Sequence, residues 1–323
     1  MTDVVAVDLG GTNIRAARVN DVGKILFRDK MPTQAEAGMA AVVTNIAQLV
    51  QKVRGPATVA VGVGTPGVPD QDTGQFRLPA CNIPGSVGYP FTTELARQIC
   101  LPVVADNDGN LAALGETWLG AGKDKHIVLI FTLGTGIGGG CVINGNVYHG
   151  HHNLGTEFGH VSIAYNGRKC ACGGIGCLEA YASASALGRD AREALRTDPA
   201  GQLSALWKMC SGASGLEKVD ARLVCDAARN GDAFASALLD RCCNWLACGM
   251  GSLINVFNPS CVILGGGMAL AGELITSRVI NHLENSFHVY KPIWKDCKLC
   301  LAVLGDDAGI LGAARMAWQK IES

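Results

Sequence analysis

The sequence of 323 residues contains little charge and few aromatic side chains. Charged residues make up 17% of the chain and aromatic residues 6%, whereas apolar residues make up 48%. The 27 basic and 28 acidic side chains leave a net charge of −1, so the chain lacks the basic excess that binds nucleic acid or an anionic membrane. This composition excludes intrinsic disorder and is typical of a globular chain of roughly two domains.

The N-terminus has no basic segment followed by an apolar run. We therefore expect no secretory signal and a cytoplasmic location. The longest uncharged stretch, 242–272, includes Pro259 and six glycines, which argues against a membrane span. Because the cytosol keeps thiols reduced, we expect most of the 14 cysteines to be free and any tight cluster of them to bind a metal.

Segments with strand and helix patterns alternate along the chain. Apolar β-branched runs predict strands at 4–8, 14–19, 59–63, 102–105, 127–131 and 261–264. Apolar spacing predicts a helix over 38–53 and a long helical stretch over 182–254. The alternation predicts an α/β protein with mixed sheets, in which the second half repeats the plan of the first. We place the domain boundary in the turn-rich segment 120–126, which gives domains at 1–122 and 123–306.

Two glycine-rich turns, about 125 residues apart, each join two predicted strands and indicate an internal duplication. The residues of interest are Asp8, Gly10, Gly11, Thr12 and Asn13 in the first turn and Gly134, Thr135, Gly136 and Gly138 in the second. No helix follows the second turn, which excludes a Rossmann fingerprint, and neither turn ends as a Walker loop does. Each is either a hairpin turn alone or a turn whose bare amides and threonine hydroxyl bind phosphate oxygens, with Asp8 holding hydrated magnesium. We favour phosphate binding because two such turns occur together.

A third pattern contains three cysteines and one histidine. His160, Cys170, Cys172 and Cys177 are spaced as His-x9-Cys-x-Cys-x4-Cys. Three thiolates and one imidazole complete a closed tetrahedral zinc site, which leaves no position for a catalytic water and so predicts a structural zinc. The alternative is chance spacing in a chain rich in cysteine.

Four motifs together resemble the ROK family of sugar kinases, and within it the bacterial glucokinases. They are Asp-x-Gly-Gly-Thr-x-x-Arg at 8–15, Leu-Gly-Thr-Gly-Ile-Gly-Gly-Gly at 133–140, Glu-Phe-Gly-His at 157–160 and Cys-x-Cys-Gly-Gly-x-Gly-Cys-Leu-Glu at 170–179. The resemblance implies a duplicated ribonuclease-H-like, actin-like ATPase fold. It also implies that a hexose and ATP bind in a cleft between two domains, that the last helix, about 307–323, returns to the first domain, and that the protein is a homodimer.

The resemblance further implies residue roles. Asp108 matches the catalytic carboxylate that accepts the hydroxyl proton of the sugar, although it could also cap the helix predicted over 110–118. The hexose ligands would be Gly67, Asn82, Asn107, Asp108, Glu157, His160 and Glu179. Gly265, Gly266 and Gly267 would join the two glycine turns in binding the nucleotide. The zinc would hold the loop of Glu157 and His160 against the loop of Glu179.

The chain departs from the family pattern at several positions near these residues. Asp106 stands where the motif usually has Glu, Gly109 where it often has Ala, Ser86 where Trp is common, and Thr156 where Gly is common. These changes leave fine sugar specificity open. We expect His126, His149, His151 and His152 to be solvated loop residues.

These observations predict ATP-dependent phosphorylation of a hexose, most simply glucose at its 6-hydroxyl, with ATP, magnesium and a structural zinc bound. The alternatives are an N-acylmannosamine kinase or fructokinase of the same family and a sugar-binding regulator without activity. Seven residues precede Asp8, whereas the winged helix of a DNA-binding repressor needs about 60, so we expect no nucleic-acid partner. The presence of Asp108 and both glycine turns favours an enzyme over a silent binding protein.

Overall fold

The computed structural model describes residues 2–80, 83–286 and 296–322. Its first sheet has the strand order β3-β2-β1-β4-β7 and its second the order β10-β9-β8-β11-β12. The first comprises β1 (Asp3–Leu9), β2 (Asn13–Asn20), β3 (Ile25–Pro32), β4 (Thr58–Thr65) and β7 (Val103–Asn107). The second comprises β8 (Ile127–Leu133), β9 (Ile137–Ile143), β10 (Asn146–Val147), β11 (Cys261–Gly265) and β12 (Lys298–Leu301).

The two sheets repeat one topology. In the first, β1 pairs antiparallel with β2 and parallel with β4, and β4 pairs parallel with β7. In the second, β9 pairs antiparallel with β10, and β11 pairs parallel with β12. The matching strand order confirms the predicted α/β class and its duplicated ribonuclease-H-like plan. Strand β3 was not predicted because most of its residues are exposed and because Arg28, Asp29 and Lys30 follow its short apolar start.

The chain divides into two compact units. The first unit contains 1–128, 140–156 and 302–323, and the second contains 129–139 and 157–301. The segment 140–156 thus groups with the first unit, whereas the sequence placed it in the second predicted domain. The predicted domains at 1–122 and 123–306, as parts that fold independently, stay a prediction.

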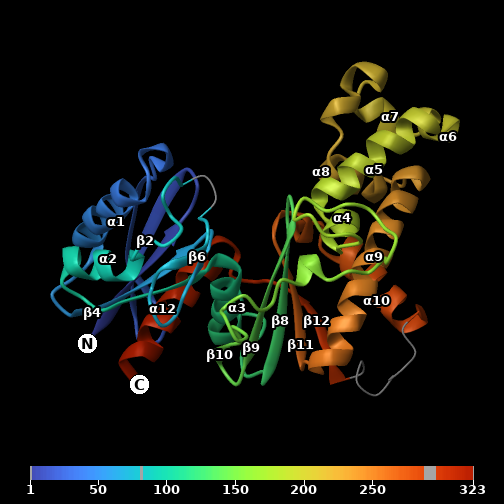
Figure 1. Ribbon diagram of the computed structural model, residues 1–323. Helices are drawn as coiled ribbons and strands as arrows, with labels where there is room; N and C mark the ends of the chain where they lie inside the picture. The colour runs from blue at the N-terminus through green and yellow to red at the C-terminus, as the bar shows by residue number, and fades with distance from the viewer. Residues whose placement is uncertain (1, 81–82, 287–295, 323) are drawn as a thin grey trace. The chain divides into compact units, whose positions relative to one another are not determined.

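Helices cover both faces of the first sheet (Figure 1). Helices α1 (Met39–Val53) and α2 (Phe91–Ile99) lie on one face, and α3 (Asp108–Leu119) and α12 (Ala308–Glu322) lie on the other. Buried valines of β1 and β4 pack against Val42, Val43 and Ile46 of α1. Gly62 of β4 allows α12 to come close, because a Cβ there would lie 2.0 Å from the carbonyl oxygen of Ala313. Helix α12 also packs against α3, which begins at Asp108.

The helical stretch predicted over 182–254 is several helices. They are α5 (Ala184–Thr197), α6 (Pro199–Leu203), α7 (Ala205–Met209), α8 (Ala221–Arg229) and α9 (Ala233–Phe257), with the 3-10 helix η3 (Gly212–Lys218) before α8. The breaks occur where a side chain caps a new helix: Asp220 accepts from the Leu223 amide at 2.8 Å, and Asp232 from the Ala235 amide at 3.0 Å. These caps divide the predicted helical stretch into separate helices.

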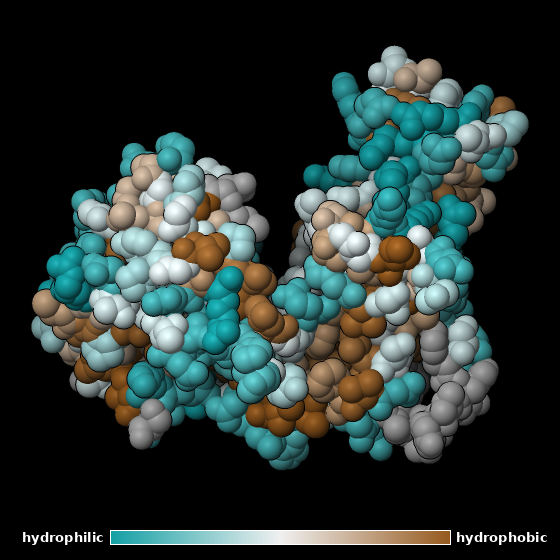
Figure 2. Space-filling view, viewed as in Figure 1, coloured by the Kyte–Doolittle hydropathy of each residue, from teal (hydrophilic) through white to brown (hydrophobic). Residues whose placement is uncertain are grey.

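The outer surfaces of helices α5 to α8 are mainly hydrophilic (Figure 2). In α8 the apolar side chains lie on one buried face, which includes Val224, Cys225 and Ala228. Helix α10 (Glu273–Ser286) packs beside α9. In the described part of the chain, no helix combines the length and apolarity that a membrane crossing requires.

A small hairpin in the first unit carries Gly67 near its start. It pairs β5 (Val68–Pro69) with β6 (Phe76–Leu78), and the buried carboxylate of Asp70 closes the turn between them. Asp70 accepts hydrogen bonds from the backbone amide of Thr73 at 2.8 Å and from the Arg77 guanidinium. These hydrogen bonds lower the pKa of Asp70 to about 2 from its ordinary value of 3.8.

We expect Asp70→Asn to lower the Tm at pH 7 and this deficit to shrink as the pH falls. Because folding depresses the pKa of Asp70, its stabilisation is fully present above the ordinary pKa and disappears as the pH approaches about 2. Thermal unfolding at a series of pH values between 7 and 3 measures the difference. The exposed neighbour Asp72 provides the control variant Asp72→Asn. A deficit that stayed the same across this range would contradict the ionic role of Asp70.

Candidate active site and metal centre

The first glycine turn joins β1 to β2 in a tight hairpin. The Gly10 amide donates to the Asn13 carbonyl at 3.0 Å, and the Thr33 hydroxyl donates to the Gly10 carbonyl at 2.6 Å. Gly11, Thr12 and Asn13 are exposed at its tip. The hairpin therefore presents backbone and the Thr12 hydroxyl to solvent, as phosphate binding requires.

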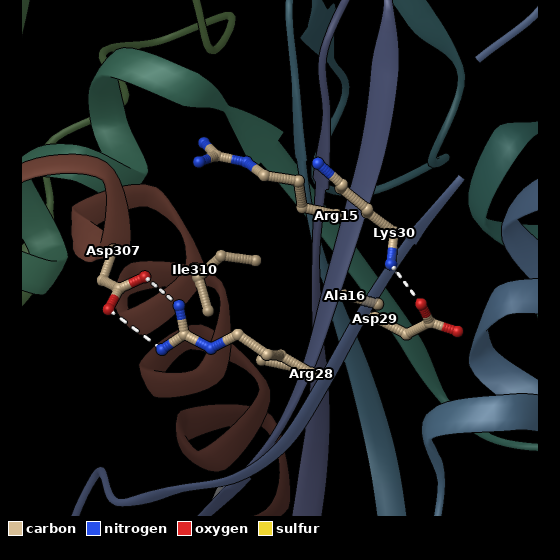
Figure 3. A pocket seen from close by; sticks show the side chains of 8 residues that line it. Arg15, Ala16, Arg28, Asp29, Lys30, Asp307 and Ile310 are labelled. Carbon is tan, nitrogen blue, oxygen red and sulfur yellow. Dashed lines mark hydrogen bonds and ion pairs between the residues drawn. The ribbon is translucent and has the colours of Figure 1, made fainter. Parts of the chain in front are cut away.

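Asp8 precedes this turn and forms an ion pair with Arg15. Oδ2 of Asp8 accepts from Nε of Arg15 at 3.0 Å and from Nη2 at 2.5 Å. Arg15 also lines a cavity of about 410 Å³, together with Arg28, Lys30 and Asp307 (Figure 3). There Arg28 forms a bidentate pair with Asp307, with both N–O distances at 3.2 Å. The carboxylates of Asp8 and Asp307 largely offset the positive charges of their guanidinium partners. This cavity is therefore not a strongly basic anion site.

Asn107 and Asp108 lie where β7 ends and α3 begins. Oδ1 of Asn107 accepts from the Gly109 amide at 2.9 Å, so Asn107 is the N-cap and Asp108 is the first residue of the helix. Nδ2 of Asn107 donates to the Gly67 carbonyl at 3.3 Å. The structure therefore brings together three of the predicted hexose ligands, namely Gly67, Asn107 and Asp108. A fourth, Asn82, lies outside the described residues.

The Asp108 side chain is exposed to solvent, yet the protein around it partly desolvates the carboxyl group. This desolvation raises the pKa of Asp108, and the negative charge of Asp8 raises it further. The Gly109 amide, which also donates to Asp108 Oδ1 at 2.8 Å, opposes the rise. A raised pKa makes the carboxylate a better proton acceptor.

The second glycine turn lies between β8 and β9 and is held by two parts of the second unit. The Gly134 carbonyl accepts from the Ala184 amide at 2.9 Å, and Oε2 of Glu179 accepts from the Ile137 amide at 2.9 Å. The third glycine run lies against the same turn, because a Cβ on Gly266 would come within 2.6 Å of the Leu133 carbonyl oxygen. Gly134, Thr135, Gly136, Gly138 and Gly265–Gly267 thus form one region.

A cavity of about 930 Å³ opens beside this region within the second unit. Gly134, Thr135 and Gly267 line it, and so do the arginines Arg192, Arg222 and Arg229. Its volume suits a nucleotide-sized ligand. The arginines come from α5 and α8, and they could not be predicted because no motif surrounds them in the sequence.

The four predicted metal ligands lie together in the second unit. The ligand atoms of His160, Cys170, Cys172 and Cys177 are all within 4.8 Å of one another. The Cys172–Cys177 Sγ–Sγ distance is 3.7 Å, and Cys170 Sγ lies 3.8 Å from His160 Nδ1. A tetrahedral zinc, with Zn–S bonds of about 2.3 Å and Zn–N bonds of about 2.0 Å, separates its ligand atoms by about 3.8 Å for S–S and about 3.6 Å for S–N. The donor set therefore fits zinc.

The predicted sugar ligands of the second unit lie close to this cluster along the chain, and one of them contacts it through its side chain. Glu157 directly precedes the 3-10 helix η2 (Phe158–His160), and His160 is the last residue of this helix. Both residues are exposed. Glu179 begins α4 (Glu179–Ala182), two residues after Cys177. Oε1 of Glu179 accepts from Cys170 Sγ at 3.6 Å. Because Glu179 also accepts from the Ile137 amide, its side chain connects the cysteine cluster to the second glycine turn.

The expectation that His149 is a solvated loop residue is wrong. Its Nε2 lies 2.6 Å from Oδ2 of Asp106, and only 26% of its side chain is exposed. His151 and His152 are exposed, with ring centroids 4.1 Å apart, and His126 lies 3.2 Å from Asn144 Oδ1 at the surface. Sequence reasoning missed the contact of His149 because 43 residues separate it from Asp106.

Comparisons with known proteins agree with the arrangement of these motifs. A model of the ROK family matches residues 4–320. A glucokinase of Thermotoga maritima is 38% identical over 98% of this chain and 98% of that protein. A glucokinase of Halalkalibacterium halodurans is 36% identical over 99% of this chain and 96% of that protein.

Solved structures give the same result. A ROK family glucokinase from Streptomyces griseus, in complex with glucose and AMPPNP, is 33% identical with a TM-score of 0.77, over 98% of this chain and 99% of that chain. A ROK hexokinase from Thermus thermophilus is 34% identical with a TM-score of 0.80, over 99% of both chains. The chain described here belongs to the ROK family.

Proposed function

We propose that the protein transfers the γ-phosphoryl group of ATP to the 6-hydroxyl of a hexose, with glucose as the preferred acceptor. The observation that carries the proposal is the accessible carboxylate of Asp108, which lies beside Asn107 and Gly67 and within the electrostatic influence of Asp8. The proposed proton acceptor, the proposed sugar ligands Asn107 and Gly67, and the proposed phosphate-binding hairpin all belong to the first unit. The full-length similarity to glucokinases and to a glucose and AMPPNP complex supports the same activity.

In the proposed reaction Asp108 orients the 6-hydroxyl and accepts its proton. The hydroxyl oxygen bonds to the γ-phosphorus, the bond from that phosphorus to the β,γ-bridging oxygen breaks, and ADP leaves with the electron pair. The two glycine turns bind the phosphates through backbone amides and through the hydroxyls of Thr12 and Thr135. Magnesium, when bound, would offset the phosphate charge, and the Asp8 carboxylate is the type of ligand it prefers.

For the metal cluster we propose one structural zinc held by His160 Nδ1 and the thiolates of Cys170, Cys172 and Cys177. The spacing of these atoms supports the proposal, because all four ligand atoms lie within 4.8 Å of one another. The zinc would order η2 and the start of α4, and thereby Glu157, His160 and Glu179 as sugar ligands.

A homodimer and a cytoplasmic location also stay predictions of the sequence. The resemblance to the family supports the dimer.

We expect glucose to exceed N-acetylmannosamine, N-acetylglucosamine, mannose, fructose and allose by at least about tenfold in kcat/KM, because a buried polar group left unpaired by the wrong sugar costs about 1–3 kcal/mol. A coupled assay of ADP release across this panel measures the preference. A control without sugar corrects for ATP hydrolysis. If N-acetylmannosamine or fructose were the better substrate, the kinase assignment would stand and the glucose preference would not.

A further inference from the structure

Asp106 is a buried carboxylate near the proposed catalytic residue Asp108. The residue is 1% exposed and lies two positions before Asp108. Its Oδ1 accepts from the Asn107 amide at 2.7 Å and from Asn110 Nδ2 at 3.0 Å. Its Oδ2 pairs with His149 Nε2 at 2.6 Å. Within the described chain, no lysine or arginine forms an ion pair with Asp106, and the His149 ring is its nearest side-chain partner.

His149 begins a segment, 149–156, that is attached to the start of α3 at two points. The first is the His149–Asp106 pair. The second is the Thr156 hydroxyl, which donates to Asn110 Oδ1 at 3.3 Å. The Gly155 amide donates to the His149 carbonyl at 2.9 Å and closes the segment into a loop. The segment 149–156 is therefore held against the residues that flank Asp108.

Thr156 adopts a backbone conformation that β-branched residues rarely occupy. Its φ is +68°, in the left-handed region. Such a conformation persists only where surrounding contacts enforce it. Here the Thr156 hydroxyl shares its one proton between the Gly155 carbonyl at 2.6 Å and Asn110 Oδ1 at 3.3 Å, and Nδ2 of the same Asn110 donates to Asp106. The strained end of this segment thus depends on the same hydrogen-bond network as the buried carboxylate of Asp106.

We infer that Asp106 and His149 are positioning residues for Asp108, an inference that rests on the proposed kinase function. Asp106 accepts hydrogen bonds from residues on both sides of Asp108, namely Asn107 and Asn110. His149 fixes the other oxygen of the same carboxylate and so prevents the Asp106 side chain from rotating. A shift of Asp106 would move the start of α3, and a misplacement of about 1 Å at a reacting group can lower turnover about 100-fold.

The inference predicts that His149→Ala lowers kcat roughly 10- to 100-fold and leaves the glucose Kd within about threefold, because the pair orients the acceptor of the proton and does not contact the sugar. His149→Gln, whose amide can donate to Asp106, should restore most of the lost turnover. Asp106→Asn should lower kcat to a similar extent. The double variant Asp106→Asn/His149→Ala should lose no more than about threefold beyond either single variant, since the two residues act as one unit. His152→Ala, on the same segment but exposed, is the control.

Hydrogen exchange provides a readout that does not depend on activity. Amides of residues 107–112 should exchange faster in His149→Ala than in the wild type or in His152→Ala, with the Tm of each variant recorded to identify general destabilisation. If the wild type phosphorylated no hexose, the proposed function would fail, and the exchange result would still decide whether the pair orders this loop. Unchanged kcat in His149→Ala, additive losses in the double variant, or unchanged exchange would each overturn the inference.

Discussion

Asp108→Asn should lower kcat by roughly 10²- to 10⁴-fold while glucose affinity changes by less than about tenfold. The amide keeps the shape of the side chain and can still accept from the Gly109 amide, but it cannot take the hydroxyl proton. Asn107, the actual N-cap, is unaltered, so α3 should remain intact. Steady-state kinetics and calorimetric binding of glucose separate the two effects.

The exposed Asp21 of the same unit offers a matched control, because Asp21→Asn makes the same chemical change away from the site. The raised pKa of Asp108 should also appear in the wild type, as a loss of kcat/KM at a pH above the ordinary pKa of aspartate when the pH is lowered. Turnover close to the wild-type level in Asp108→Asn would assign the proton acceptor to a different residue, with Asp106 as the first to test.

Purified protein should contain close to one zinc per chain, and Cys172→Ser should lose that zinc together with most activity and solubility. A serine hydroxyl stays protonated at neutral pH and does not replace a thiolate ligand. Loss of a structural zinc removes several kcal/mol of stability, so the Tm should fall by about 10 °C or more in a chain of this size. Elemental analysis and thermal unfolding measure the two changes.

Cys100→Ser is the matched control, since Cys100 is an exposed thiol outside the cluster. It should retain its zinc, its Tm and its activity. Fully active protein without bound zinc would refute the structural role that we propose for His160, Cys170, Cys172 and Cys177.

Much of the fold could be predicted from the sequence because its signals are local. Buried β-branched runs identified β1, β4, β8 and β11 to within a few residues. The edge strand β3 is mostly exposed and has three consecutive charged residues at its centre, so pairing with β2 rather than burial makes it a strand. Its residues have no alternation of buried and exposed side chains that would predict a strand from the sequence.

In the candidate site, too, the features with a local sequence pattern could be predicted and those formed by distant residues could not. Three of the four predicted metal ligands fall within eight residues, so their spacing alone indicated a cluster. By contrast, the pairing of Asp106 with His149, and the arginines from α5 and α8 at the larger cavity, arise only when distant segments pack together. No local pattern identifies such contacts. Thr156 lies between these two cases. The sequence shows a threonine where the family commonly has glycine, and the structure shows that this position has a positive φ.

The central claim is that this chain phosphorylates glucose at oxygen 6 with ATP. Phosphorus NMR of a reaction of the wild-type protein with ATP, magnesium and glucose tests it most directly. The account predicts equal amounts of ADP and glucose 6-phosphate, with no inorganic phosphate beyond a control without protein. ADP accompanied by inorganic phosphate alone, or a phosphate ester at a different hydroxyl of glucose, would contradict it.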